Sequence, residues 1–222
     1  MILGIDTSLG TAVAVIEPDG LVLAEASSAD PLGHAEAIGG LLQSALADAS
    51  LGPVGATAPP VAPVLTHVAS GMGPGPFTGL RVGIAAARAF ALGRGIPVVP
   101  VASHDAVALD LLLADPFDEP GPFAVVTDAR RREFAFTVYD GLDDDGLPVR
   151  LTQPALVPRD ELDDVLARLG AARRDAAAVS AAMLALVAGR IVAAGRLPAS
   201  TEPLYLRAPD VTLPKGPKKV GT

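Results

Sequence analysis

The stretch of the sequence that most constrains the fold is a run of glycine and proline at residues 71–81, Gly-Met-Gly-Pro-Gly-Pro-Phe-Thr-Gly-Leu-Arg. Glycine and proline at this density exclude the interior of a helix or a sheet. An apolar strand is predicted before the run, at residues 64–69, and a helix after it, at residues 79–94. The run therefore forms a tight loop from a strand into the amino end of a helix, where backbone amides favour anions.

Two interpretations of this loop stay open from its residues alone. It is either a turn that binds nothing or a cradle for an anionic ligand. Pro76 weakens the second, because proline has no amide hydrogen to donate. The loop is also not a Walker A loop, which ends in Gly-Lys followed by Ser or Thr, whereas this one ends in Thr78-Gly79-Leu80-Arg81.

Composition and charge exclude several classes of protein. The 222 residues suffice for one large or two small domains, and no apolar run approaches the roughly 20 residues of a membrane span. There is no cysteine, so disulfides, thiolate nucleophiles and cysteine metal ligands are excluded. A formal charge of −8 argues against a stand-alone nucleic-acid binder. We expect a cytoplasmic protein that does not associate with membranes.

Hydrophobic periodicity predicts an α/β protein built from two related units. The first unit has the order βββαβαβα, with strands at 2–6, 11–16, 21–26, 64–69 and 98–101 and helices at 34–49, 79–94 and 103–114. The other unit has the pattern of a shortened copy, with strands at 123–127, 133–139 and 149–157 and helices at 158–169 and 175–194. Short links predict an antiparallel meander for the first three strands, and a helical crossover predicts that the strands at 64–69 and 98–101 are parallel.

Three regions follow from this order. Residues 1–114 form the first domain, with the glycine-rich loop. A break rich in proline and acidic residues at 115–122 begins a shortened second domain, residues 115–202. Residues 203–222 are predicted to be an extended tail. The stretch Ala171-Ala172-Arg173-Arg174 between the last two helices carries no strand pattern, so the architecture of the second domain is left open.

The loop and several other motifs resemble the bacterial TsaB (YeaZ) family. That family carries Gly-Pro-Gly-Ser-Phe-Thr-Gly-Leu-Arg where this chain reads the same with Pro76 in place of serine. The opening residues 2–8 also match, as do four further motifs in the family's order along most of the chain. These motifs are Gly33-His34-Ala35-Glu36, Val99-Pro100-Val101-Ala102-Ser103, Asp128-Ala129-Arg130-Arg131 and Pro203-Leu204-Tyr205-Leu206-Arg207. Each motif alone is weak, but the ordered set is specific.

The resemblance implies an actin-like ATPase (ribonuclease H-like) fold and a role without catalysis. A TsaB-like protein binds and activates TsaD, the subunit that transfers a threonylcarbamoyl group to adenosine 37 of tRNA. TsaE and the tRNA join through the complex, and the protein can form a homodimer when alone. The resemblance implies no cofactor of the protein's own, with any ATP or ADP held at the interface of the complex.

A nucleotide cleft that has lost its function is the interpretation that we favour for the turn and the loop. Actin-like ATPases place phosphate and magnesium at the first hairpin turn, and no second acidic phosphate motif is evident. The residues assigned to this degenerate cleft are Asp6, Thr7, Ser8, Gly73, Gly75 and Thr78. An aspartate in such a turn can also simply cap the turn.

The helix at 79–94 predicts a partner surface. Between residues 82 and 93 only Arg88 is polar, and most of the others are alanine or glycine. A helix apolar all round must be covered on more than one side, either by the second domain or by a partner. The resemblance implies a four-helix bundle with TsaD. Residues placed near it are Ile38, Leu42, Ala45, Leu80, Ile84, Ala87, Arg88 and Ala91.

No catalytic residue and no metal site is predicted. The three histidines, His34, His67 and His104, are not at ligand spacing, and no serine lies in a Gly-x-Ser-x-Gly elbow. Lys215, Lys218 and Lys219 make either a solvated end or a weak contact with tRNA phosphate. Two alternative functions remain: an actin-like phosphotransferase with its own ATP site, and a stand-alone homodimer that uses the same helices.

Overall fold

A computed structural model describes residues 1–30, 33–50, 62–114, 121–196, 198 and 201–207. Its first sheet contains β1 (Ile2–Asp6), β2 (Thr11–Ile16), β3 (Val22–Ser28), β4 (His67–Gly71) and β5 (Val98–Val101), in the order β3-β2-β1-β4-β5. The first three strands pair antiparallel, and β1, β4 and β5 pair parallel. The predicted meander and the predicted parallel pair are therefore confirmed.

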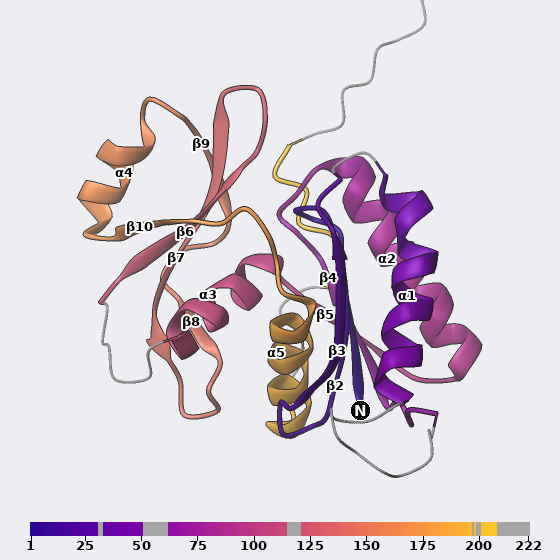
Figure 1. Ribbon diagram of the computed structural model, residues 1–222. Coiled ribbons are helices and arrows are strands. Elements are labelled where there is room, and N and C mark those ends of the chain that lie inside the picture. Colours follow the sequence, from indigo (N-terminus) through magenta and orange to yellow (C-terminus); the bar gives the residue numbers. More distant parts are fainter. Residues whose placement is uncertain (31–32, 51–61, 115–120, 197, 199–200, 208–222) are drawn as a thin grey trace, which may run out of the picture.

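Helices cover both faces of this sheet (Figure 1). On one face lie α1 (His34–Ser50) and α2 (Phe77–Arg94), packed over β2, β3 and β4. On the other lies α5 (Ala181–Ala193), which packs on β1 and β2 although it comes from the end of the chain. Since both faces are covered, β1 and β2 are buried along their whole length and are apolar at nearly every position.

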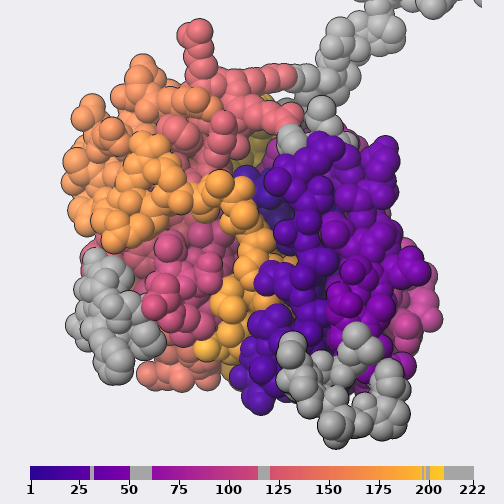
Figure 2. Space-filling view, in the orientation of Figure 1, coloured from indigo at the N-terminus to yellow at the C-terminus, as the bar shows by residue number. Residues whose placement is uncertain are grey.

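The second sheet also has five strands and stands beside α5 (Figure 1). It contains β6 (Phe123–Asp128), β7 (Glu133–Leu142), β8 (Pro148–Arg150) and β10 (Ala172–Asp175) in the order β10-β6-β7-β8, while β9 (Ala155–Pro158) pairs with β7. α3 (Ser103–Ala114) packs between this sheet and α5, and α4 (Leu162–Leu169) covers the other side. Figure 2 shows the two halves meeting along the orange segment between β10 and α5.

The structure corrects several predicted boundaries. The strand predicted at 64–69 is β4, His67–Gly71, and the strand predicted at 149–157 is two short strands, β8 and β9. The residues left without structure at 171–174 belong to β10, which pairs in parallel with β6. All four residues of β10 are exposed and three are charged, so neither an apolar run nor an alternation marks it. The helix predicted at 175–194 is correspondingly shorter and begins after Ser180, whose hydroxyl accepts a hydrogen bond from the Met183 amide.

The fold has one large core between the two sheets, a second core under α1 and α2, and a smaller one under α4. The first contains residues of β1, β5, α3, β6, β7 and α5, including Leu109, Phe123 and Tyr139. The second contains Leu3, Ile5 and Val13 of the sheet with Ala87 and Ala91 of α2. α3 and α5 thus each bind the two sheets together, and the boundary predicted at residue 114 stays a prediction.

Candidate functional site

The glycine-rich loop folds directly onto the turn between β1 and β2. Glycine is required there by contact rather than by flexibility. A Cβ at Gly75 would lie 2.7 Å from the Cα of Ser8, and one at Gly79 would lie 2.7 Å from the carbonyl oxygen of Thr7. The Thr7 hydroxyl donates a hydrogen bond of 2.7 Å to the Gly79 carbonyl. The loop and the turn, both predicted from sequence to face one cleft, therefore lie in contact.

Asp6 is the buried centre of this contact. Its Oδ1 accepts hydrogen bonds from the Ser8 amide (2.7 Å) and the Ser8 hydroxyl (2.5 Å), and its Oδ2 accepts one from the Ser103 hydroxyl (2.5 Å). Ser103 in turn accepts from the Gly73 amide at 3.1 Å. Only 1% of Asp6 is exposed, and burial raises the pKa of its carboxyl. Asp6 therefore joins β1, the loop and the start of α3, and both of its oxygens are occupied by the protein itself.

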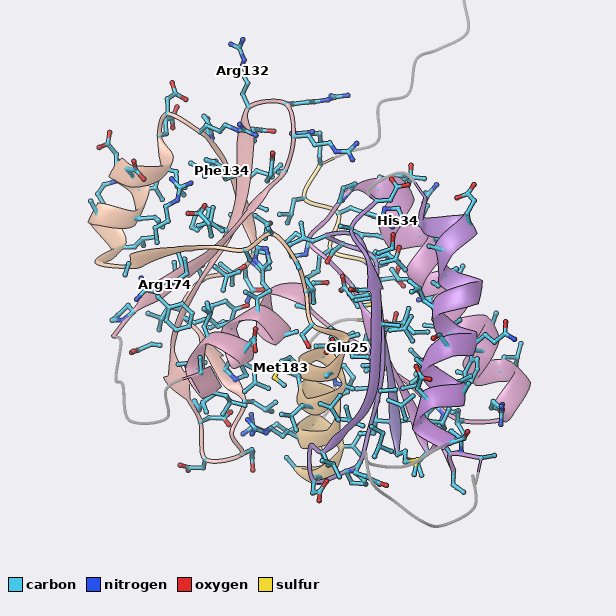
Figure 3. The ribbon with its side chains drawn as sticks, viewed as in Figure 1. Glu25, His34, Arg132, Phe134, Arg174 and Met183 are labelled. Atoms are coloured by element: carbon cyan, nitrogen blue, oxygen red, sulfur yellow. The ribbon has the colours of Figure 1, made fainter. Side chains whose placement is uncertain are left out.

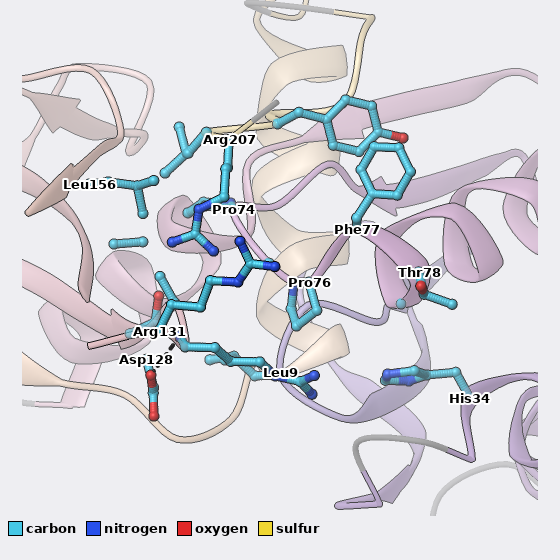
Figure 4. A pocket seen from close by; sticks show the side chains of 18 residues that line it. Leu9, His34, Pro74, Pro76, Phe77, Thr78, Asp128, Arg131, Leu156 and Arg207 are labelled. Carbon is cyan, nitrogen blue, oxygen red and sulfur yellow. Dashed lines mark hydrogen bonds between the residues drawn. The ribbon is translucent and has the colours of Figure 1, made fainter. Parts of the chain in front are cut away.

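A pocket of about 570 Å³ opens beside this contact, between the loop and the β6–β7 turn (Figure 4). Two of the six residues predicted for a nucleotide cleft, Gly75 and Thr78, line it. Asp6, Thr7 and Ser8 do not line it, because they are buried beneath the loop, and neither does Gly73, which is buried within the loop. The lining residues are Leu9, His34, Pro74, Gly75, Pro76, Phe77, Thr78, Gly79, Thr127, Asp128, Ala129, Arg130, Arg131, Ala135, Leu156, Tyr205, Leu206 and Arg207.

Three consecutive arginines form the β6–β7 turn at the pocket's rim. Arg130, Arg131 and Arg132 all have positive φ, at 62°, 51° and 63°. Arg131 points into the pocket (Figure 4), and Arg132 points away from the protein (Figure 3). Asp128 starts the turn by accepting a hydrogen bond from the Arg130 amide at 2.7 Å. In the sequence, residues 128–131 match a motif of the TsaB family, but no ligand site was predicted there. The signal that could have found the site is three adjacent arginines in a hairpin turn of an acidic chain.

The segment 201–207 closes one side of the pocket. The Leu204 amide donates to the carbonyl oxygen of Met72 at 2.8 Å. The Tyr205 ring lies 4.5 Å from that of Phe77, and the Arg81 guanidinium stands 3.7 Å above the Phe77 ring. Arg207 forms an ion pair with Glu133 of β7. This segment therefore binds the loop, α2 and the second sheet together, while residues 208–222, with the three lysines, lie outside the described residues.

The predicted partner residues lie mostly inside the protein. Those buried in its own core are Ile38, Ala45, Leu80, Ile84, Ala87 and Ala91. Leu42 is half-buried, and Arg88 is exposed with its guanidinium donating to the Thr201 carbonyl at 3.2 Å. They were chosen as the apolar positions of each helix, and those are the positions that the sheet covers. The exposed positions of the two helices carry polar side chains, among them Glu36, Gln43, Arg81 and Arg94, and Leu92. They also carry small residues: Gly39, Gly40 and Ala47 of α1, and Ala85, Ala89 and Gly93 of α2.

The histidines take three different environments. His34 is the first residue of α1, with Nδ1 2.9 Å from the Thr11 hydroxyl. His104 is buried between the hydroxyls of Thr137 (2.8 Å) and Thr127 (3.0 Å), and burial lowers its pKa to about 3. His67 is half-buried at the start of β4. Across the part of the chain that the structure describes, no three metal-ligating side chains come together, and no helix has the length and hydropathy to span a bilayer.

Comparison with known proteins identifies the family. The family model "TsaD: tRNA N6-adenosine threonylcarbamoyltransferase" matches residues 31–147, slightly more than half of the chain. Rv3421c of Mycobacterium tuberculosis and Mb3455c of Mycobacterium bovis are 36% identical to this chain, over 94% of it and 92% of their own length. ML0378 of Mycobacterium leprae is 34% identical over the whole chain and 60% of its own length.

Two solved structures share the fold. YeaZ from Pseudomonas aeruginosa has a TM-score of 0.66 at 21% identity and covers 90% of this chain and 98% of its own. A second Pseudomonas aeruginosa protein, described as similar to peptidase YEAZ, has a TM-score of 0.70 at 22% identity and covers 93% and 99%. They confirm the predicted actin-like (ribonuclease H-like) fold with a shortened second unit. The chain belongs to the family that the threonylcarbamoyltransferase model describes, and the predicted resemblance to its TsaB (YeaZ) members is confirmed.

Proposed function

We propose that this protein is a non-catalytic, cytoplasmic TsaB-type subunit that binds and activates TsaD in the threonylcarbamoylation of adenosine 37 of tRNA. TsaE and the tRNA join through the assembled complex, and any ATP or ADP is held at its interface. Membership of the threonylcarbamoyltransferase family supports a role in this tRNA modification. The single observation that supports a scaffold role is the solvent side of α1 and α2, where small residues and one exposed large apolar side chain lie among polar residues.

That side chain is Leu92, which is 84% exposed on α2. Ala85, Ala89 and Leu92 recur at intervals of four and three residues, so they form one stripe along the helix. Gly39 and Gly40 of α1 face open space, because a Cβ built on either would have no described atom outside the helix's own backbone within 4 Å. Small residues allow the backbone of a partner helix to approach closely, and a leucine beside them supplies an apolar anchor.

The state of Asp6 supports the absence of catalysis. In a phosphotransferase of this fold the turn carboxylate must reach a magnesium ion or the water around it. Here the Asp6 oxygens bond Ser8 and Ser103 and are covered by the loop. A Cβ on Gly71 would lie 1.9 Å from Oδ2, so no space remains beside the carboxylate. We therefore do not propose the phosphotransferase alternative.

The test is complex formation between the full chain and TsaD from the same organism, measured as mass by light scattering at micromolar concentration. We expect a heterodimer that Leu92→Glu disrupts, because a carboxylate would be buried without a partner. Leu169→Glu is the matched control, since Leu169 is an exposed leucine at the end of α4, on the second sheet. Ala87→Glu is unsuitable, because Ala87 is buried in the chain's own core.

Three results would contradict the proposal. A mixture that contains no heterodimer would remove TsaD as the partner. Equal loss of the complex in both leucine variants would remove α2 as the interface. A homodimer that persists when TsaD is added would favour the stand-alone homodimer instead.

A further inference from the structure

Residues 201–207 form a strap on the outside of α2 and are the yellow segment beside the start of that helix (Figure 1). Two arginines of α2 hold the strap. The Arg88 guanidinium donates to the Thr201 carbonyl at 3.2 Å, and Arg81 Nε donates to the Tyr205 hydroxyl at 3.3 Å. The strap therefore runs along α2 toward its amino end, because the earlier strap residue is bonded to the later helix residue.

The two arginines lie on the same face of α2 as the apolar stripe proposed for the partner. Positions 81, 85, 88 and 92 follow one another at intervals of four, three and four residues, so they share one face of the helix, and all four are exposed. Ala85 and Leu92 thus stand one turn before and one turn after Arg88. A partner helix that packs on this stripe therefore also meets Arg88 and the strap to which it is bonded.

The strap lies on the surface of the protein and belongs to no core. None of its residues is buried, and Tyr205 is 38% exposed. Besides the two arginines, the strap is held by the Tyr205 ring, 4.5 Å from that of Phe77, and by the Leu204 amide, which donates to the Met72 carbonyl at 2.8 Å. Loss of the tyrosine ring should therefore release the strap and leave the cores intact.

The two helix faces alone are small for a stable complex. α2 has 18 residues and is about 27 Å long and about 10 Å across, so its outer face measures about 270 Å². α1 has 17 residues and adds a similar area, whereas a stable interface takes about 800 Å² from each partner. The strap spans at most about 23 Å beside α2 and is an adjoining surface that supplies part of the difference.

We propose that the strap is a second part of the TsaD-binding surface, beside the outer faces of α1 and α2, and that Arg88 is a positioning residue that holds it there. This inference rests on the proposed function, because TsaD is the partner in both. It deepens that function, since none of the eight predicted partner residues lies in the strap.

The experiment is calorimetric titration of TsaD with the full chain and its variants. Tyr205→Ala removes the ring that lies against Phe77 and the acceptor of Arg81. If the strap is then docked in about one molecule in ten, the affinity falls about tenfold, because only the docked state is competent to bind. Tyr205→Phe keeps the ring pair and loses one exposed hydrogen bond, so its affinity should stay within about threefold of the parent.

The positioning role of Arg88 is tested with a double variant. Arg88→Ala should weaken binding by a similar factor, and the double variant with Tyr205→Ala should lose little more, because both changes release the same strap. Arg168→Ala removes an exposed arginine of α4, is the matched control and should bind like the parent. Losses that multiply in the double variant would overturn the positioning role, since Arg88 would then contact TsaD directly.

Hydrogen exchange in the unmodified chain gives a readout that does not depend on any variant. TsaD should slow the exchange of the Leu204 amide, and Tyr205→Ala should speed it in the chain alone. Unchanged exchange of this amide in the presence of TsaD, or parental affinity of Tyr205→Ala, would overturn the inference. If Leu92→Glu disrupts the heterodimer and Tyr205→Ala does not, the proposed function stands and the role of the strap fails. If the parent chain does not bind TsaD, both fail.

Discussion

Replacement of Asp6 by alanine tests whether this carboxylate stabilises the fold or serves to bind a ligand. The change removes the acceptor of three hydrogen bonds, which the Ser8 amide, the Ser8 hydroxyl and the Ser103 hydroxyl donate to Asp6. These three donors are buried. A buried polar group left unsatisfied costs about 1–3 kcal/mol, and Ser103 keeps its contact with the Gly73 amide. We therefore expect the free energy of unfolding to fall by about 3 kcal/mol.

The assay is urea unfolding at equilibrium, followed by circular dichroism. Asp160→Ala is the control, because this aspartate is exposed and surface changes usually stay within about 0.5 kcal/mol. A carboxylate kept for a ligand lowers stability in the empty protein, so its removal is neutral or stabilising. An Asp6→Ala variant as stable as the parent would therefore refute the structural role.

The pH dependence of the same variants gives an independent check. Burial raises the pKa of Asp6 above its ordinary value of 3.8. The folded state therefore favours the protonated carboxyl. The stability that this protonation contributes is fully present below pH 3.8 and is lost as the pH rises through the raised pKa of Asp6. The asparagine of the Asp6→Asn variant cannot ionise. As the pH rises from 3.8 through the raised pKa of Asp6, the free energy of unfolding should therefore fall less for this variant than for the parent protein. Parallel curves for the parent and the variant would contradict this account.

Three further predictions concern two glycines and one histidine. Gly4→Ala should destabilise by at least about 3 kcal/mol, because its Cβ would lie 2.1 Å from the backbone oxygen of Ala181 and α5 would have to move. Gly39→Ala, in the open interior of α1, should instead stabilise by about 0.5–1 kcal/mol in the same urea assay, and a loss of stability there would contradict the exposed helix. The pKa of His104, lowered to about 3, predicts that stability present above pH 6.5 is lost as the pH falls toward 3. His104→Gln should flatten that acid limb, and an unchanged limb would contradict the buried neutral imidazole.

Local signals in the sequence were sufficient for the first domain. Apolar runs of four to six residues, broken by Gly10, Gly20 and the loop at 71–76, place β1, β2, β4 and β5. Each of these signals is local, because a buried strand must be apolar wherever both of its faces are covered. Contact between the β1–β2 turn and the glycine-rich loop also follows from order alone, since β1 and β4 are parallel neighbours and their carboxyl ends meet.

The local sequence pattern did not predict an element whose stability comes from contacts with distant parts of the chain. β10 is exposed and charged, and it is a strand because the edge of β6 is free to pair with it. The eight predicted partner residues stay a prediction, although six of them lie in the chain's own core. An apolar position on a helix predicts that something covers it, but not whether the cover is the chain's own sheet or another protein.

By itself the sequence determined the family, the order of the elements and the place of the loop, because these depend on residues close together in the chain. Only the tertiary structure decided what the site contains. It buried Asp6 against Ser103, 97 positions away, and brought His34, the amino end of α2 and the arginine turn to one pocket. Those contacts join segments that the sequence keeps far apart, and the free energy that fixes them comes from packing across both sheets.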